Sequence, residues 1–168
     1  MKKAEENYRN GERDGKWTYW YENGHKREES TYKDGFYYVI NNTWDENGEI
    51  MVKDGNGIGI TWYDNGKKES EGTYKNGKQD GKWNKWWDNG QKESEGTYKN
   101  GTLDGLWTYW YNINGQKRSE GTFKDGESDR LYTDWYINGE KKEESTYKNG
   151  KLIESKCWDA DGNEEECD

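Results

Sequence analysis

Short aromatic stretches alternate with short polar stretches along the whole chain, and glycine-containing pairs separate them. Trp107, Tyr109 and Tyr111 would share one side of an extended strand. Thr108 and Trp110 lie between them and would face the other side. The apolar spacing of three and four residues that marks an amphipathic helix is absent. Because aromatic residues and threonine favour strands, the pattern predicts an all-β protein.

The polar stretches end in Gly-Thr followed by an aromatic residue, as in Lys92 to Tyr98. Ser94, Gly96 and Tyr98 would share one side of such a strand. We expect the small residues at these positions to leave room for the large rings of the neighbouring strand.

Asn-Gly and Asp-Gly pairs that follow Lys or Arg recur every 20 to 25 residues. These pairs accept positive φ and favour tight turns between antiparallel strands. A period of this kind indicates a repeat array in which each unit stacks on the next. The sequence therefore predicts one domain over residues 1–168 with seven hairpin units, starting near Tyr8, Tyr32, Val52, Tyr74, Tyr98, Phe123 and Tyr147, and with 157–168 as a C-terminal capping hairpin.

The predicted fold is an elongated, single-layer antiparallel β-meander of roughly a dozen strands, with a core of stacked Trp and Tyr rings. Two places depart from the repeat. Only seven residues separate Gly48 from Gly55, so one strand there must be short or missing. At Asp129-Arg130, an arginine stands where other units carry the glycine of an Asp-Gly pair.

The composition, taken without the aromatic residues, would not support a folded protein. Leu, Ile, Val and Phe together number only 15, the net charge is −9, and 36% of the residues are charged, which would indicate a disordered acidic chain. The 11 Trp and 14 Tyr residues supply the missing apolar surface. The acidic balance argues against nucleic acid and anionic lipid as partners.

No apolar run is long enough for membrane insertion. The first residues lack the apolar stretch of a signal peptide. We therefore expect a cytoplasmic protein if Met1 is the native start, and a secreted or envelope protein if a signal peptide has been removed.

The sequence offers no catalytic constellation. The single histidine, His25, follows a predicted turn, where a solvent-exposed role is expected. Acidic residues recur with the repeats, which is typical of the solvated face of a sheet. The segment Asp159 to Asn163 lacks the spacing of a calcium loop. We predict no catalytic residue, no cofactor and no metal site, and hence no enzyme.

Cys157 and Cys167 flank one predicted turn. A two-residue loop would pair position 157 with 166, so a disulfide needs a bulge or a longer loop. A bridge would tie down the terminal hairpin and would imply an oxidising compartment. Free thiols are the alternative.

Several aromatic residues are expected on the face opposite the main ring ladder, and exposed rings can hold a protein partner or stack on sugars. The alternative is that they form a second half of the core beneath Lys and Glu stems. The second unit, with its apolar segment from Phe36 to Ile40, is the most distinctive repeat. The candidate partner-binding residues are Trp20, Trp86, Trp110, Trp135, Phe36 and Tyr38.

The phrase Gly-Thr-Tyr-Lys-Asn-Gly-Lys-x-Asp-Gly-x-Trp at Gly72 to Trp83 resembles the MORN-type repeat. With the segment from Trp86 to Lys92, the chain is most similar to the bacterial variant found in YwqK-type antitoxins. The resemblance extends from Tyr8 to about Asp161, although units two, three and seven depart from the phrase. It implies an array of antiparallel hairpins without catalytic residues, and for some members an immunity role against a toxin.

Three functions follow as hypotheses. The first is a protein-binding module of the antitoxin or immunity type that masks a basic partner such as a toxin. The second is a carbohydrate- or envelope-binding module that uses exposed aromatic rows. The third is a structural protein that self-associates through its open edge strands. Binding that weakens with salt would favour the first over the second.

Overall fold

The computed structural model describes residues 3–167, with the side chains of Tyr37 and Tyr38 excepted. This part of the chain is all-β and contains no helix, as predicted. Within it, no helix could therefore cross a membrane. The strands are β1 (Ala4–Glu5), β2 (Tyr8–Arg9), β3 (Glu12–Arg13), β4 (Gly15–Trp20), β5 (Lys26–Lys33), β6 (Phe36–Trp44), β7 (Ile50–Lys53), β8 (Asn56–Trp62), β9 (Lys68–Lys75), β10 (Lys78–Trp86), β11 (Lys92–Lys99), β12 (Thr102–Trp110), β13 (Lys117–Lys124), β14 (Glu127–Trp135), β15 (Lys141–Lys148), β16 (Lys151–Trp158) and β17 (Glu164–Glu165).

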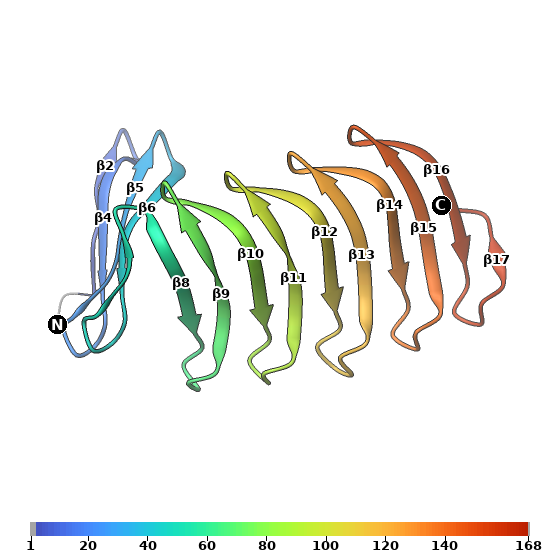
Figure 1. Ribbon diagram of the computed structural model, residues 1–168, viewed down its shortest axis with the longest axis horizontal. Coiled ribbons are helices and arrows are strands. Elements are labelled where there is room, and N and C mark those ends of the chain that lie inside the picture. The colour runs from blue at the N-terminus through green and yellow to red at the C-terminus, as the bar shows by residue number, and fades with distance from the viewer. Residues whose placement is uncertain (1–2, 168) are drawn as a thin grey trace. The chain divides into compact units, whose positions relative to one another are not determined.

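The strands follow one another in a meander (Figure 1). Fifteen of them form one antiparallel sheet in chain order, from which only β2 and β3 are absent, and these two pair with each other. The predicted antiparallel meander is confirmed, but the expected dozen strands is too few. Two-residue strands such as β1 and β17 are too short to leave a repeat signature.

The chain divides into two compact units, which we describe separately. Unit 1 comprises Met1–Ile60 and Gly72–Asp80, and unit 2 comprises Thr61–Glu71 and Gly81–Asp168. The short interval before Gly55 holds β7, a strand of four residues in unit 1, so the prediction of a short strand is confirmed.

The tight hairpins have the predicted turn chemistry. In the turn between β11 and β12, Asn100 has a φ of 53° and Gly101 a φ of 89°. Asn149 and Gly150 repeat this between β15 and β16, with φ values of 49° and 73°. Positive φ at both central residues defines the type I′ turn, whose twist matches that of the flanking strands.

Several rings lie against a glycine of the preceding strand. In unit 2, a Cβ atom placed on Gly96 would lie 2.2 Å from the ring of Trp107, so no larger residue fits there. Trp107 is 3% exposed, and its Nε1 donates to the carbonyl oxygen of Thr97 at 2.9 Å. In unit 1, Trp17 is fully buried and donates in the same way to the Asn7 carbonyl at 3.0 Å. The predicted match of small residues to neighbouring rings is confirmed.

The strands that carry these rings bend just before them. In β12, Gly105 has a φ of 82°, and the register with β11 shifts between Glu95 and Thr97. Positive φ and a register shift together turn the strand, and Figure 1 shows β10, β12 and β14 curving in this region. In β14 the residue at this position is Arg130, which adopts a φ of 68°.

Side-chain hydrogen bonds join consecutive repeats at the turns that are drawn at the bottom of Figure 1, such as those after β12 and β14. The Tyr111 hydroxyl donates to the carbonyl of Trp135 at 2.7 Å, and Tyr136 donates to that of Trp158 at 3.0 Å. The amide of Asn114 donates to the carbonyl of Ile137 at 2.8 Å. Each bond spans one repeat, so side chains hold the turns together where the strand pairing has ended.

The C-terminal hairpin departs from this series. Asp159 occupies the tyrosine position and accepts backbone N–H bonds from Asp161 and Asn163 at 3.0 and 2.8 Å. These bonds lower the pKa of Asp159, with the Asn163 side chain contributing most.

Cys157 and Cys167 form a disulfide, with Cα atoms 5.3 Å apart. A two-residue loop would have paired position 157 with 166, but the observed turn is longer. Cys157 pairs with Glu165, and Cys167 follows two residues later. The same turn contains Asp159, so the bridge ties down the final strand beside the acidic loop.

The strained Arg130 gives a stability test. Left-handed backbone costs a residue with a Cβ about 1–2 kcal/mol, whereas glycine adopts it freely but loses more entropy on folding. We expect Arg130→Gly to raise the free energy of unfolding by about 0.5–1 kcal/mol, measured by urea denaturation.

The matched control is Gly105→Arg, at the equivalent position of β12. Since a Cβ on Gly105 would meet no atom within 4 Å, only its φ of 82° penalises the change. This variant should lose about 1–2 kcal/mol. Equal stability of the wild type and both variants would contradict the account of the bend.

Candidate functional site

The sheet of unit 2 has two different faces. We call one the lysine–tryptophan face, which carries Lys68, Lys92, Lys117 and Lys141 with Trp86, Trp110, Trp135 and Trp158. We call the other the groove face, which carries Trp83, Tyr98, Trp107, Tyr109, Phe123, Tyr132 and Tyr147.

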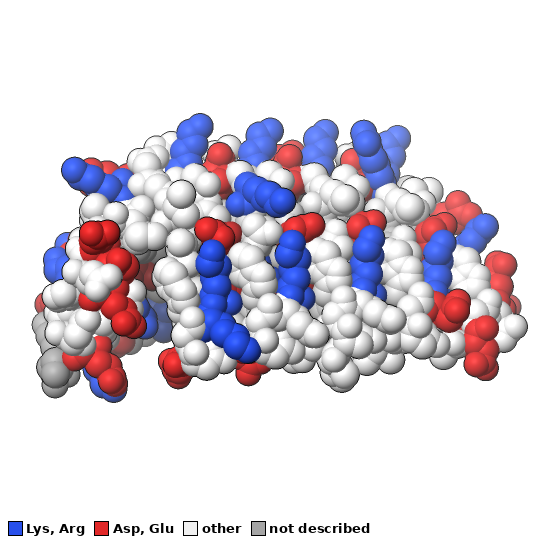
Figure 2. Space-filling model, turned by 60° about the horizontal axis from the view of Figure 1, so that its bottom comes forward, with Lys and Arg blue, Asp and Glu red and all other residues white. Residues whose placement is uncertain are grey.

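On the lysine–tryptophan face, one arrangement recurs in every repeat. The Lys92 ammonium lies 5.4 Å from the ring centroid of Trp110 and 2.5 Å from a carboxylate oxygen of Glu95. Lys117 lies 5.3 Å from the Trp135 centroid in the same way. Figure 2 shows evenly spaced basic side chains with acidic groups beside them. The charges on this face therefore neutralise one another.

The predicted partner-binding tryptophans lie in these rows. Trp86, Trp110 and Trp135 are half-buried in unit 2, each beneath a lysine ammonium. Trp20 is half-buried at the equivalent position of β4 in unit 1. A cation over a ring stabilises both groups.

The two predicted residues of the second repeat lie elsewhere, on β6 of unit 1. Phe36 is 78% exposed at the start of the strand. The side chain of Tyr38 lies outside the described part of the structure. The same strand supplies Ile40 to the core, 5% exposed, and the neighbouring β7 supplies Val52, which is fully buried.

The groove face holds a groove of about 420 Å³, formed by strands β10 to β12 and by the turn between β13 and β14. Trp107, Tyr109 and Tyr98 line it together with small residues of the hairpin tips, such as Gly101 and Gly126. The ring centroids of Tyr98 and Trp107 are 4.9 Å apart, and their planes are inclined by 77°. A concave, ring-lined volume of this size is typical of a binding site.

The repeats differ from one another where they line this face. Lys85, Tyr109 and Asp134 occupy the same position of β10, β12 and β14, each directly opposite a serine. The position is therefore cationic, neutral and anionic in successive repeats, while the ring two residues earlier stays Trp or Tyr. A residue that recurs in every repeat stabilises the packing of one repeat on the next, whereas a residue that changes between repeats can determine which partner binds.

A second position, on strands β11 and β13, also changes its charge between repeats. Glu93 lines the groove beside Ser94 because a bulge opposite Lys85 and Trp86 turns both residues toward it. The next repeat carries Arg118 at this position, with its guanidinium 5.6 Å from the Tyr109 centroid. The charges on the groove face therefore differ between repeats, whereas the lysine and glutamate pairs of the other face recur.

Burial perturbs two groups on this face. It raises the pKa of Tyr109 to about 12, with Tyr132 and Tyr98 adding to the shift and Arg118 opposing it. It also raises the pKa of Asp134, to which the facing carboxylate of Glu143 adds, while Lys142 and Arg118 oppose the shift. Asp134 forms no ion pair within residues 3–167. A cation from a partner would relieve this unfavourable charge.

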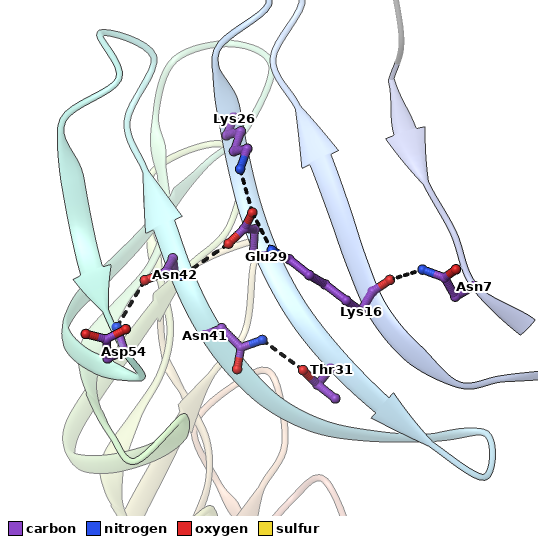
Figure 3. A network of polar contacts seen from close by, with 8 residues as sticks. All are labelled: Asn7, Lys16, Lys26, Glu29, Thr31, Asn41, Asn42 and Asp54. Carbon is purple, nitrogen blue, oxygen red and sulfur yellow. Dashed lines mark hydrogen bonds and ion pairs between the residues drawn. The ribbon is translucent and has the colours of Figure 1, made fainter.

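The clearest carboxylate shift in the structure belongs to Glu29 in unit 1, and its surroundings are structural (Figure 3). Burial opposes ionisation of Glu29, but hydrogen bonds from Lys16, Lys26 and Asn42 outweigh it and lower the pKa to about 2. The Lys16 and Lys26 ammonium groups lie 2.8 and 2.6 Å from the same carboxylate oxygen. With its charge fully compensated, Glu29 has no capacity left for a substrate.

The described residues contain no cluster of three or more His, Cys, Asp or Glu side chains arranged for a metal. His25 is exposed, and its Nδ1 lies 2.9 Å from the carbonyl oxygen of Glu46. Both cysteines are consumed by the disulfide. We find no residue set for a cofactor among residues 3–167.

Comparison with known families agrees with the repeat geometry. The family model described as the MORN repeat variant matches residues 13–34, 56–76 and 79–100. These matches support a MORN-repeat protein. MORN repeats are generally protein- or membrane-binding modules and are typically non-enzymatic. No curated protein sequence matches the chain. The YwqK-type assignment and the bacterial origin stay predictions.

Glu29 predicts the pH dependence of stability. Since its pKa is lower in the folded than in the unfolded chain, its contribution is fully present above about pH 4.5 and is lost as the pH falls toward about 2. We expect Glu29→Gln to lower the free energy of unfolding by about 2–3 kcal/mol at pH 7, and much less at pH 2.5. Urea denaturation across this range measures both.

Glu95→Gln is the matched control. Glu95 occupies the equivalent position in unit 2, where its side chain is 32% exposed and pairs with Lys92. A partly exposed pair contributes about 1 kcal/mol or less. If both variants lost the same stability at every pH, the Glu29 network would not be the source of the acid sensitivity.

Proposed function

We propose that this chain is a non-enzymatic module that binds a protein partner through the groove face of unit 2. The observation that carries the proposal is the ring-lined groove of about 420 Å³, whose bordering residues change charge between otherwise similar repeats. Half-buried rings such as Tyr98 and Tyr109 provide the large, rigid contact area found in interface hot spots. Lys85 and Glu93 at its border add selectivity.

The partner we propose is basic. The chain carries a net charge of −9, so long-range attraction speeds its encounter with a cationic protein. On the groove face, Asp134 lies directly opposite Glu143 across β14 and β15. A lysine or arginine between them would remove the repulsion between the two carboxylates. Such binding would mask a basic surface, as an immunity protein masks its toxin.

Two other functions proposed from the sequence have less support. Sugar stacking on the lysine–tryptophan face has less room, because the hollow beside Trp135 has a volume of about 310 Å³, against about 420 Å³ for the groove. Self-association through the C-terminal edge would use β17, a two-residue strand with the sequence Glu164–Glu165. Short, charged edge strands are a common protection against edge-to-edge pairing.

Adjacent residues of β12 allow a matched test. Tyr109 borders the groove, whereas Trp110 lies beneath Lys92 on the other face. We expect wild type and Trp110→Ala, used as affinity baits in lysate of the source cell, to retain the same basic protein. Tyr109→Ala should lose most of it. Salt of about 0.5 M should release the partner, because it screens exposed charges.

Mass spectrometry of the bound fraction measures the outcome. If Tyr109→Ala retained the partner and Trp110→Ala lost it, the binding site would lie on the lysine–tryptophan face. Recovery of cell-wall material in place of a protein would favour the glycan function.

A further inference from the structure

The groove face of unit 2 presents half-buried rings at a regular step. Tyr98, Phe123 and Tyr147 come from β11, β13 and β15, and each is separated from the next by one intervening strand. Neighbouring strands lie about 4.7–4.9 Å apart, so equivalent positions of consecutive repeats recur about every 9.4–9.8 Å. A ligand that lies across the strands meets the same surroundings at this interval.

This step selects among peptide conformations. A polyproline II helix has three residues per turn and rises about 3.1 Å per residue, so it presents the same face about every 9.3 Å. An extended strand presents the same face about every 6.8 Å. An α-helix returns to nearly the same face after seven residues, or about 10.5 Å. Of the three, polyproline II stays closest in step with the rings.

We propose that the groove binds a basic, proline-rich segment of the partner in the polyproline II conformation. This inference rests on the proposed function and specifies its partner. Grooves lined by aromatic side chains suit such segments, because a preformed polyproline II helix loses little entropy on binding. Tyr98 is half-buried and packs nearly perpendicular to the buried ring of Trp107 at 4.9 Å, so Tyr98 is the ring that a proline would contact.

Charge complementarity sets the spacing of the partner's basic residues. Glu93 on β11 borders one end of the groove, and Asp134 and Glu143 face each other on β14 and β15. These carboxylates are three to four strands apart, or about 14–19 Å. Two arginines six residues apart in polyproline II are separated by about 18.6 Å and lie on the same face. Arg118 lies between the two acidic positions. An uncharged proline of the partner at this point avoids the repulsion that a basic residue would meet from the Arg118 guanidinium.

The probe is a capped peptide in which five prolines separate two arginines, titrated into the full chain by calorimetry. One control replaces the prolines by alternating glycine and serine, which keeps the charge and removes the conformation. A second adds one proline, which turns the second arginine by about 120° away from the groove. We expect each control to bind at least about fivefold more weakly.

Variants of the chain locate the site. Tyr109→Ala should weaken binding about tenfold, as expected for an aromatic hot spot, and Trp110→Ala should change it by less than about twofold. Asp134→Asn should weaken binding and reduce its salt dependence. Because Asp134 is half-buried and forms no ion pair with another described residue, this change tests the site without removing a core ring.

The proposal fails if the glycine–serine peptide binds as well as the proline peptide, if the added proline has no effect, or if no peptide binds. It also fails if only Trp110→Ala weakens binding. If these peptides fail while retention of the protein partner still depends on Tyr109, the groove function stands and the polyproline II assignment alone is wrong.

Discussion

The packing of a large ring against glycine governs this structure. Trp107 lies on Gly96, and Tyr132 lies on Gly121, where added Cβ atoms would approach the rings to 2.2 and 2.1 Å. With so few aliphatic residues, the chain cannot build an ordinary two-layer core. Rings pressed onto bare backbone bury apolar surface within the sheet itself, and the indole N–H satisfies a backbone carbonyl in the same contact.

The bend and the groove follow from that contact. A strand must turn at Gly105 to bring Trp107 over the preceding strand, and the turn uses a left-handed residue. Repetition of the bend in β10, β12 and β14 makes one face concave. The opposite face is left to lysine, glutamate and tryptophan, which compensate one another in every repeat. The groove face can vary without disturbing the stack.

Much of this fold is predictable because its determinants are local. The turn pairs, the β-rich pattern and the match of Gly96 to a neighbouring ring all depend on residue types within one or two strands. The groove is not predictable in this way, because alternation treats each strand as straight and unbulged. Bulges place both Glu93 and Ser94 on the groove face, which a strict period of two forbids.

Three other features of the structure escape a reading of single strands for the same reason. Arg130 breaks the Asp-Gly pattern in sequence, yet it keeps the left-handed backbone, because the surrounding contacts require the bend. The pairing of Cys157 depends on the length of a turn that one Asp-Gly pair does not fix. The aromatic rows at Trp110 and Trp135 are visible in the sequence, but the lysines over them come from the neighbouring repeat in space.

We infer that partners bind the groove face of unit 2. Photocrosslinking tests it most directly, with a photoreactive phenylalanine analogue placed at position 109 in one sample and at position 110 in another. These adjacent positions of β12 face opposite sides of the sheet. We expect irradiation in the presence of the partner to give a covalent adduct from position 109 and none from position 110. An adduct from position 110 alone would contradict the account.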